Sequence, residues 1–335
     1  MITPRTISII ITAYNSEKYI GDCLVSLAAQ TNPDWMALIM DDGSNDKTAE
    51  ILKTWAKKDP RIHVFQQKNQ GSSAARNALL GKVKTPYACF VDSDDLLHPR
   101  ALAVALDIME YSGADVVEYG IARVDEAAKP ADVATELTRF TAEWDTLNAP
   151  YVARKKRGGN WINVTNKLYR ADIVKEIRFD PELVYEDDLW FSTLAHNAGP
   201  KKIVIGVPLY FWRKNPNSKT QKIDFDRYVG SAIRRVFLMN TYFGVGHRLN
   251  QACWQDYVRD LAQDAYRMIL RKNIRHNPNS ADKERVFWRA SAALERLVKE
   301  RVFYTSYLST PQRFAVWLCR KKHYRLCRWL VALVG

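Results

Sequence analysis

Residues 87–95 read YACFVDSDD, an apolar run that ends in three carboxylates within four residues. The run over residues 87–91 predicts a buried strand, and Asp92, Asp94 and Asp95 follow it directly. Carboxylates this close repel one another, so gathering them is costly unless a cation compensates their charge. Mg²⁺ and Mn²⁺ suit such oxygen ligands and bind through one or two carboxylates plus substrate phosphates. The stretch therefore predicts a site for a metal and a diphosphate, with helix capping as the plainer alternative.

Strand and helix signals alternate through the first third of the chain. Apolar runs predict strands at residues 7–11, 35–40, 62–65 and 87–91. Helical spacing predicts helices at residues 17–30, from residue 45 or 46 onward, and at residues 72–81. Strands separated by helices of this length form βαβ units and a parallel sheet. Because the crossovers are right-handed, the carboxyl ends of the strands meet at one edge, where open α/β sheets bind ligands.

The later part of the chain changes character. One more helix and strand are expected between residues 101 and 120, and a further strand at residues 203–212. Beyond residue 224 the apolar residues follow helical spacing only. We therefore expect an α/β domain with a mostly parallel central sheet over residues 1–222 and a helical C-terminal module over residues 223–335.

Composition narrows the class of protein. The 50 Lys and Arg outnumber the 37 Asp and Glu, which gives a net charge of +13 and favours anionic partners such as phosphates, an anionic membrane surface or nucleic acid. Five scattered cysteines argue against a disulfide framework and suggest a reducing compartment. We find no signal-peptide pattern, and the apolar run at residues 329–334 is too short to span a bilayer.

Four stretches, in order and at plausible spacing, resemble one family. They are SIIITAYN at residues 8–15, DDGS at 41–44, NQGSSAARN at 69–77 and VDSDD at 91–95. The chain resembles the family-2 inverting glycosyltransferases of the GT-A fold over roughly residues 6–219. Ala13 departs from the family, which usually has Pro there, but the change removes no functional group.

This resemblance implies an enzyme, a hexosyl- or N-acetylhexosaminyl-transferase that uses a UDP-sugar and a divalent cation, Mn²⁺ or Mg²⁺. The donor half would cover about residues 1–120 and the acceptor half about 121–222. The acceptor would be a hydroxyl of a glycan or a lipid-linked glycan, in the synthesis of a surface polysaccharide or lipopolysaccharide. No nucleic-acid partner is expected, since no RNA- or DNA-binding motif accompanies the charge.

On the donor side, the resemblance assigns roles residue by residue. Thr12, Tyr14 and Glu17 match positions around the nucleotide base. Arg76 lies in the segment beside it, with a salt bridge on a solvated helix face as the plainer alternative. Asp41 matches the carboxylate that accepts a hydrogen bond from the uracil imide N–H. Asp42 either has a neighbouring role or is a capping residue. Asp92 would face the ribose or the sugar. The metal is assigned to Asp94, which Asp95 could share.

On the acceptor side, residues 185–190 read YEDDLW and match the family's acidic motif at a helix start. The match makes Asp187 the general base, with Asp188 as the alternative; like charges and partial burial would raise the pKa of the base. Trp161, Lys167 and Glu186 are expected to line the acceptor side, although Lys167 could be a surface charge. Arg213 either reaches the diphosphate or is a surface or cation–π arginine beside Trp212.

The C-terminal segment predicts an amphipathic helix over residues 315–334. Lys321, Arg325 and Arg328 share one face, and apolar residues lie broadly opposite. Such a helix either lies in a membrane interface or packs on its own domain. We favour the membrane, and hence a cytoplasmic enzyme attached peripherally to the inner face of the cell membrane.

Two rival classes remain. A nucleotidyltransferase on a related α/β fold would need a Gly-rich phosphate loop near the first strand, and residues 12–16 are not such a loop. A basic protein that binds membranes or nucleic acid without catalysis would not need the acidic motifs.

Overall fold

The structure is a computed structural model. It describes residues 3–134, 163–185, 187–199, 201–216 and 310–321, and the single residues 227, 230, 231, 234, 238, 292 and 295. The chain divides into two compact units. The first contains residues 1–149, 153–181 and 186–216, and the second contains residues 150–152, 182–185 and 217–335. The predicted domain limit at residues 222 and 223 lies outside the described residues and stays a prediction.

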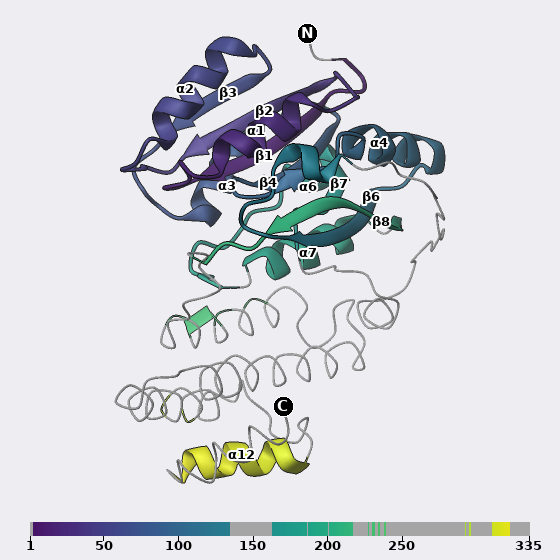
Figure 1. The fold of residues 1–335 in the computed structure, drawn as a ribbon. Coiled ribbons are helices and arrows are strands. Elements are labelled where there is room, and N and C mark those ends of the chain that lie inside the picture. The colour runs from purple at the N-terminus through teal and green to yellow at the C-terminus, as the bar shows by residue number, and fades with distance from the viewer. Residues whose placement is uncertain are drawn as a thin grey trace. The chain divides into compact units, whose positions relative to one another are not determined.

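One eight-stranded sheet organises the first unit (Figure 1). Its spatial order is β3-β2-β1-β4-β7-β6-β8-β5. The first four strands of this order are parallel, β7 runs antiparallel to both of its neighbours, and β6 pairs in parallel with β8. The strands are β1 Ile7–Ala13, β2 Trp35–Asp41, β3 Ile62–Gln66, β4 Tyr87–Asp92, β5 Leu96–Leu97, β6 Val116–Val124, β7 Lys167–Arg170 and β8 Lys202–Arg213.

Helices cover both faces of this sheet (Figure 1). Side chains of α1, α2 and α4 pack into the core on one face, and those of α3, α6 and α7 pack on the other. The helices of this unit are α1 Ile20–Ala28, α2 Thr48–Lys58, α3 Ser72–Leu80, α4 Ala101–Ser112, the 3-10 helix η1 Pro130–Val133, α6 Ala171–Val174 and α7 Asp187–Ala198.

Strand β1 shows why these runs are apolar throughout rather than alternating. Ile7, Ile9 and Ile11 point into the core under α1, while Ile10 points into the core on the α3 side. Successive side chains of a strand face opposite sides, and both sides of this sheet are covered. All four isoleucines are at most 1% exposed, so the strand that carries the first functional loop is anchored on both faces.

The expected α/β class and mostly parallel sheet are confirmed, with differences in detail. The predicted helix at residues 17–30 is shorter, since α1 covers Ile20–Ala28; beyond its end the Gln30 side chain donates to the carbonyls of Ser26 and His98. Strands β5 and β7 were not predicted; β7 has four residues and β5 has two. Their pairing depends on distant segments, so no local pattern marks them.

Of the helical module, the structure describes α12, Thr310–Arg320. The rest of the amphipathic segment, from residue 322 onward, lies outside the described residues. Over the part of the chain that is described, no helix has the length and apolar character needed to cross a membrane.

Candidate active site

The carboxyl ends of three neighbouring strands meet at one edge of the sheet. In the register of the sheet, Ala13 at the end of β1 is opposite Asp41 of β2, and Thr12 is opposite Asp92 of β4. The two acidic strand ends therefore flank the end of β1, as right-handed crossovers require. Tyr14 lies just beyond, with 47% of its surface exposed. An aromatic face and two carboxylates are thus available at the same edge.

Asp41 is buried and fixed by two donors. Its Oδ1 accepts from the backbone N–H of Ser44 at 3.1 Å, and its Oδ2 accepts from Nε2 of Gln66 at 3.3 Å. The turn between them needs Gly43, whose φ is +75° and where a Cβ would lie 2.9 Å from the backbone nitrogen of Asn69. The carboxylate of Asp41 is thereby held in one orientation at the strand end.

Asp42 caps the neighbouring loop. Its carboxylate accepts from Nε2 of Gln67 at 2.8 Å and from the backbone N–H groups of Gln70 and Gly71 at 2.9 and 2.8 Å. Of the two roles that the sequence left open, these contacts support the capping role. They anchor the loop that leads into α3.

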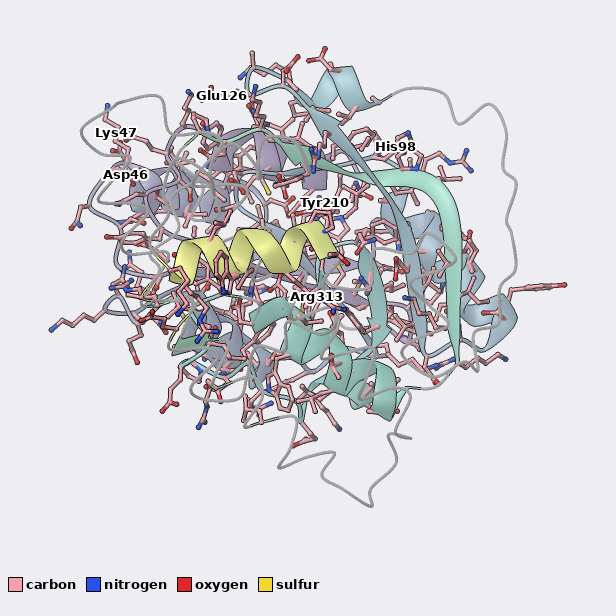
Figure 2. The ribbon with its side chains drawn as sticks, turned by 90° about the horizontal axis from the view of Figure 1, so that it is seen from below. Asp46, Lys47, His98, Glu126, Tyr210 and Arg313 are labelled. Carbon is pink, nitrogen blue, oxygen red and sulfur yellow. The ribbon has the colours of Figure 1, made fainter. Side chains whose placement is uncertain are left out.

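Glu17 joins the loops that follow β1 and β2. Its backbone N–H donates to Oδ2 of Asp46 at 3.1 Å, and its own Oε2 accepts from the backbone N–H of Lys47 at 2.9 Å. Asp46 and Lys47 are labelled next to each other in Figure 2. Asn15 adds a third tie, because its Oδ1 accepts from the backbone N–H of Asn45 at 2.9 Å. The loops around the strand ends are therefore braced against each other.

Asp95 is buried behind the acidic strand end. Its Oδ2 accepts from the hydroxyl of Tyr210 at 2.6 Å, and its Oδ1 accepts from the backbone N–H of Arg213 at 2.9 Å. Tyr210, labelled in Figure 2, comes from β8. Burial, followed by the charges of Asp94 and Asp92, raises the pKa of Asp95 well above its usual value. These contacts tie the loop after β4 to β8.

Asp94 is more accessible than Asp95, and its donor set fits a divalent cation. Its Oδ2 accepts from Nδ2 of Asn215 at 2.8 Å, and burial together with the charge of Asp92 raises its pKa. A cation would relieve that cost. Within the described ranges, no three or more His, Cys, Asp and Glu gather as a complete metal cage. The residues present fit the pattern in which Mg²⁺ or Mn²⁺ takes one or two carboxylates and completes its shell with substrate phosphates.

Arg213 lies inside the protein rather than on its surface. It is 1% exposed, and its Nη1 donates to Oδ2 of Asp22 at 3.1 Å and to the carbonyl of Glu126 at 3.2 Å. The interpretation as a surface arginine beside Trp212 is therefore wrong, because the strand turns Arg213 inward, over the ring of Tyr19. Its charge still reaches the site, since it lowers the pKa of Asp94.

On the other side of the site, the first turn of α7 presents two carboxylates. Asp187 is 9% exposed, and its Oδ2 accepts from the hydroxyl of Ser73 at 2.9 Å and from Nη1 of Arg76 at 3.2 Å. The same nitrogen donates to Oδ1 of Asp188 at 2.6 Å. Burial raises the pKa of Asp188 to about 7, Arg76 lowers it, and Asp187 raises it. The acidic pair therefore carries a group that changes charge near neutral pH.

Lys167 belongs to a buried ionic group, so its interpretation as a surface charge is wrong. Its Nζ donates to Oδ1 of Asn166 at 2.8 Å and lies 3.6 Å from Oε2 of Glu118, which also pairs with Lys202. Lys167 is 0% exposed, and burial lowers its pKa to about 8. Of the other two predicted acceptor-side residues, Trp161 and Glu186 both lie outside the described residues.

Sequence reasoning missed three side chains that support the site: Ser73, Glu118 and Asn215. Ser73 could have been found, because it lies three residues before Arg76 on a predicted helix and so shares its face. An acidic residue within the apolar strand around Glu118 was a second signal, since a buried charge demands a partner. Asn215 had no signal beyond its place two residues after Arg213.

A mostly parallel α/β sheet with helices on both faces and carboxylates at its carboxyl edge fits the GT-A fold. The sequence model described as "Glycosyl transferase family 2" matches residues 8–178. The chain therefore belongs to glycosyltransferase family 2 and catalyses glycosyl transfer.

Individual relatives agree with this assignment. The uncharacterized glycosyltransferase EpsJ of Bacillus subtilis is 27% identical over 281 residues, which are 82% of this chain and 79% of that protein. TuaG of the same species, named for teichuronic acid biosynthesis, is 38% identical over 104 residues, 31% of this chain and 41% of that protein. The crystal structure of S. aureus TarS residues 1–349 in complex with UDP-GlcNAc is 21% identical, with a TM-score of 0.67, over 98% of this chain and 90% of that chain. At that identity the likeness establishes the fold.

Proposed function

We propose that this glycosyltransferase transfers a hexosyl or N-acetylhexosaminyl group, with inversion, from a UDP-sugar to a hydroxyl of a glycan or lipid-linked acceptor. The product would belong to a surface polysaccharide or lipopolysaccharide. The observation that carries the proposal is the placement of Asp41, Asp92 and Asp94 at one sheet edge, with Asp187 joined to Asp92 through Arg76. The names of TuaG and of the TarS complex with UDP-GlcNAc support the acceptor class and the donor.

The donor would lie along the strand ends. Thr12, Tyr14 and Asp41 would surround the uracil, with Asp41 accepting from its imide N–H. Glu17 would act by holding the loop around the base, because its carboxylate is committed to the backbone of Lys47. Asp92, whose side chain is 40% exposed, would accept from hydroxyls of the ribose or the sugar.

Asp94 would hold a Mn²⁺ or Mg²⁺ ion together with the diphosphate, while Asp95 fixes the loop from behind. The ion, when bound, would stabilise the negative charge that develops on the leaving diphosphate. Arg213 would add positive potential from beneath the loop rather than by direct contact. Asp187 would take the proton from the acceptor hydroxyl, and Lys167 would support the acceptor side from within the core.

A panel of nucleotide sugars tests this proposal without assuming an acceptor. The full chain is incubated with UDP-, GDP- and dTDP-linked sugars in Mn²⁺, in Mg²⁺ and with a chelator, and release of the nucleotide is measured. We expect release from a UDP-sugar that depends on the cation. Preference for a GDP-linked donor, or equal release with the chelator, would contradict the donor or the cation respectively.

We also propose that the enzyme is cytoplasmic and attached peripherally to the inner face of the cell membrane through its C-terminal helix. Along α12, Arg313, Trp317 and Arg320 recur at helical spacing, and Trp317 is 48% exposed. Each basic residue near an anionic surface contributes about 1 kcal/mol. Removing residues 311–335 should release the protein from anionic vesicles and leave UDP binding intact. Equal sedimentation of both forms with vesicles would contradict the attachment.

A further inference from the structure

A single guanidinium connects the two sides of the site. Arg76 of α3 donates through Nη2 to Oδ1 of Asp92 at 3.1 Å, at the end of β4. Through Nη1 it donates to Oδ2 of Asp187 at 3.2 Å and to Oδ1 of Asp188 at 2.6 Å, at the start of α7. Its side chain is 9% exposed. Two elements that are far apart in the sequence are therefore joined by one buried side chain.

The position of this guanidinium is itself fixed. Its central carbon lies 5.1 Å from the ring centre of Phe179, which stacks on Phe191 of α7. Ser73 lies one turn earlier on α3, on the same face, and donates to the same oxygen of Asp187 as Arg76 does. Helix α3 thus supplies two donors to Asp187, and the carboxylate has little freedom to turn.

The charges around this point explain why the guanidinium is needed. The pKa of Asp188 is lowered by the charge of Arg76 on α3 and raised by the charges of Asp187 beside it and Asp92 of β4. The charge of Asp188 in turn raises the pKa of Lys167 and of Tyr169, both on β7. Three carboxylates face one cation, and without that cation burial would favour the neutral form of Asp188. The guanidinium keeps negative charge on this cluster and sets the direction of its oxygens.

We propose that Arg76 is the positioning residue of the general base, which it holds in register with the donor-binding carboxylate Asp92. This inference rests on the proposed function, in which Asp187 is the base. Arg76 acts through Asp187 and does not read the nucleotide. It differs from the role beside the uracil that the sequence resemblance implied, and the two roles have opposite kinetic signatures.

Three variants separate these roles. Arg76→Lys keeps the charge but loses the fork of donors, Arg76→Ala loses both, and Ser73→Ala loses one neutral donor to Asp187. Arg61→Lys is the matched control. Arg61 forms an ion pair with Asp59, with Nη2 and Oδ2 2.7 Å apart, and neither residue belongs to the site. We measure kcat and KM for the donor, the dissociation constant of UDP by calorimetry, and the dependence of kcat on pH.

For Arg76→Lys we expect kcat to fall about ten- to hundredfold, the usual cost of misplacing a catalytic group, while UDP affinity stays within about twofold. Ser73→Ala should lower kcat by less and leave the pH profile in place. In Arg76→Ala the acidic limb of kcat should move to higher pH, because the cation that lowers the pKa of Asp188 is gone, and added guanidinium should restore part of kcat. Loss of UDP affinity with kcat retained would overturn the proposal.

A readout that needs no turnover keeps this inference distinct from the proposed function. Carboxyl carbon NMR follows the titration of Asp188 in the wild type, in Arg76→Ala, in Arg76→Lys and in the Arg61→Lys control. If the titration midpoint of Asp188 moves to higher pH in Arg76→Ala and not in the control, the result supports the proposed role of Arg76. An unchanged midpoint overturns it. Failure of the proposed function would appear separately, as a wild-type enzyme that binds UDP but releases it from no donor in the panel.

Discussion

Under the proposed function, the loops at the ends of β1 and β2 form a donor edge and the start of α7 with Arg76 forms a base side, and different kinds of bond hold the two. At the donor edge, Asp42 and Glu17 accept from backbone N–H groups of the neighbouring loops. On the base side, Asp187 and Asp188 are held chiefly by the guanidinium of Arg76. Many shared backbone donors fix a loop redundantly, whereas a buried ion pair depends on the charge of every member. We therefore expect the base side to be far more sensitive to substitution and to pH than the donor edge.

The largest effect should come from Asp187→Asn. The amide keeps the shape of the side chain but cannot take a proton, so transfer should slow by roughly 10²–10⁴, the usual contribution of a positioned base. UDP affinity should stay at the wild-type value, because the donor edge is untouched. Steady-state rates and calorimetry measure the two quantities. If Asp187→Asn were active and Asp188→Asn inactive, the general base would be Asp188 instead of Asp187.

Asp94→Ala should produce the next largest effect, on binding rather than on rate. Interactions of charged groups are worth about 1.5–3 kcal/mol, so UDP affinity in Mn²⁺ should fall roughly ten- to hundredfold. Without the cation, wild type and variant should bind UDP alike. Asp107→Asn is the matched control, because that carboxylate is exposed and pairs with Arg5 at 2.7 Å. Equal UDP affinity of Asp94→Ala and the control in Mn²⁺ would contradict the metal site.

The dependence on pH tests the contrast between the two sides directly. Burial raises the pKa of Asp188 to about 7, so protonation below that pH removes one of the two negative charges that face Arg76 and should lower kcat as the pH falls. Above that pH the rate should level off. UDP affinity measured from pH 6 to pH 8 should change little. A limb near pH 7 that persists in Asp188→Asn would assign the titration to another group.

The fold and the identity of the chemical groups could be predicted from sequence because their signals are local. The buried strand that ends in Asp92 is visible as an apolar run followed by carboxylates, and the helix start at Asp187 is indicated by its resemblance to the family's acidic motif. What those side chains contact is not local. Asp95 turned out to face β8, and Lys167 the buried Glu118, through pairings between segments far apart in the chain.

Arg76 illustrates the limit best. Its motif is visible in the sequence, but its three partners come from β4 and α7, which only the folded sheet brings together. Sequence reasoning placed it beside the nucleotide on resemblance alone. The position of β7 between β4 and β6, which no local pattern indicates, places Tyr169 edge-on against Phe191 of α7.

The smallest effect should come from Glu17→Gln, which tests whether Glu17 only braces the loops of the donor edge. The amide oxygen can still accept from the backbone N–H of Lys47, and three further hydrogen bonds between the same loops remain: one to Asp46, and two that Asn15 makes with Asn45 and Ser44. One neutral hydrogen bond contributes about 1 kcal/mol, so UDP affinity should fall by about fivefold at most. The exposed Glu50→Gln on α2 is the matched control, and calorimetry measures both. A loss of a hundredfold would mean that the carboxylate of Glu17 itself contacts the nucleotide, because a redundant brace cannot account for so large a change.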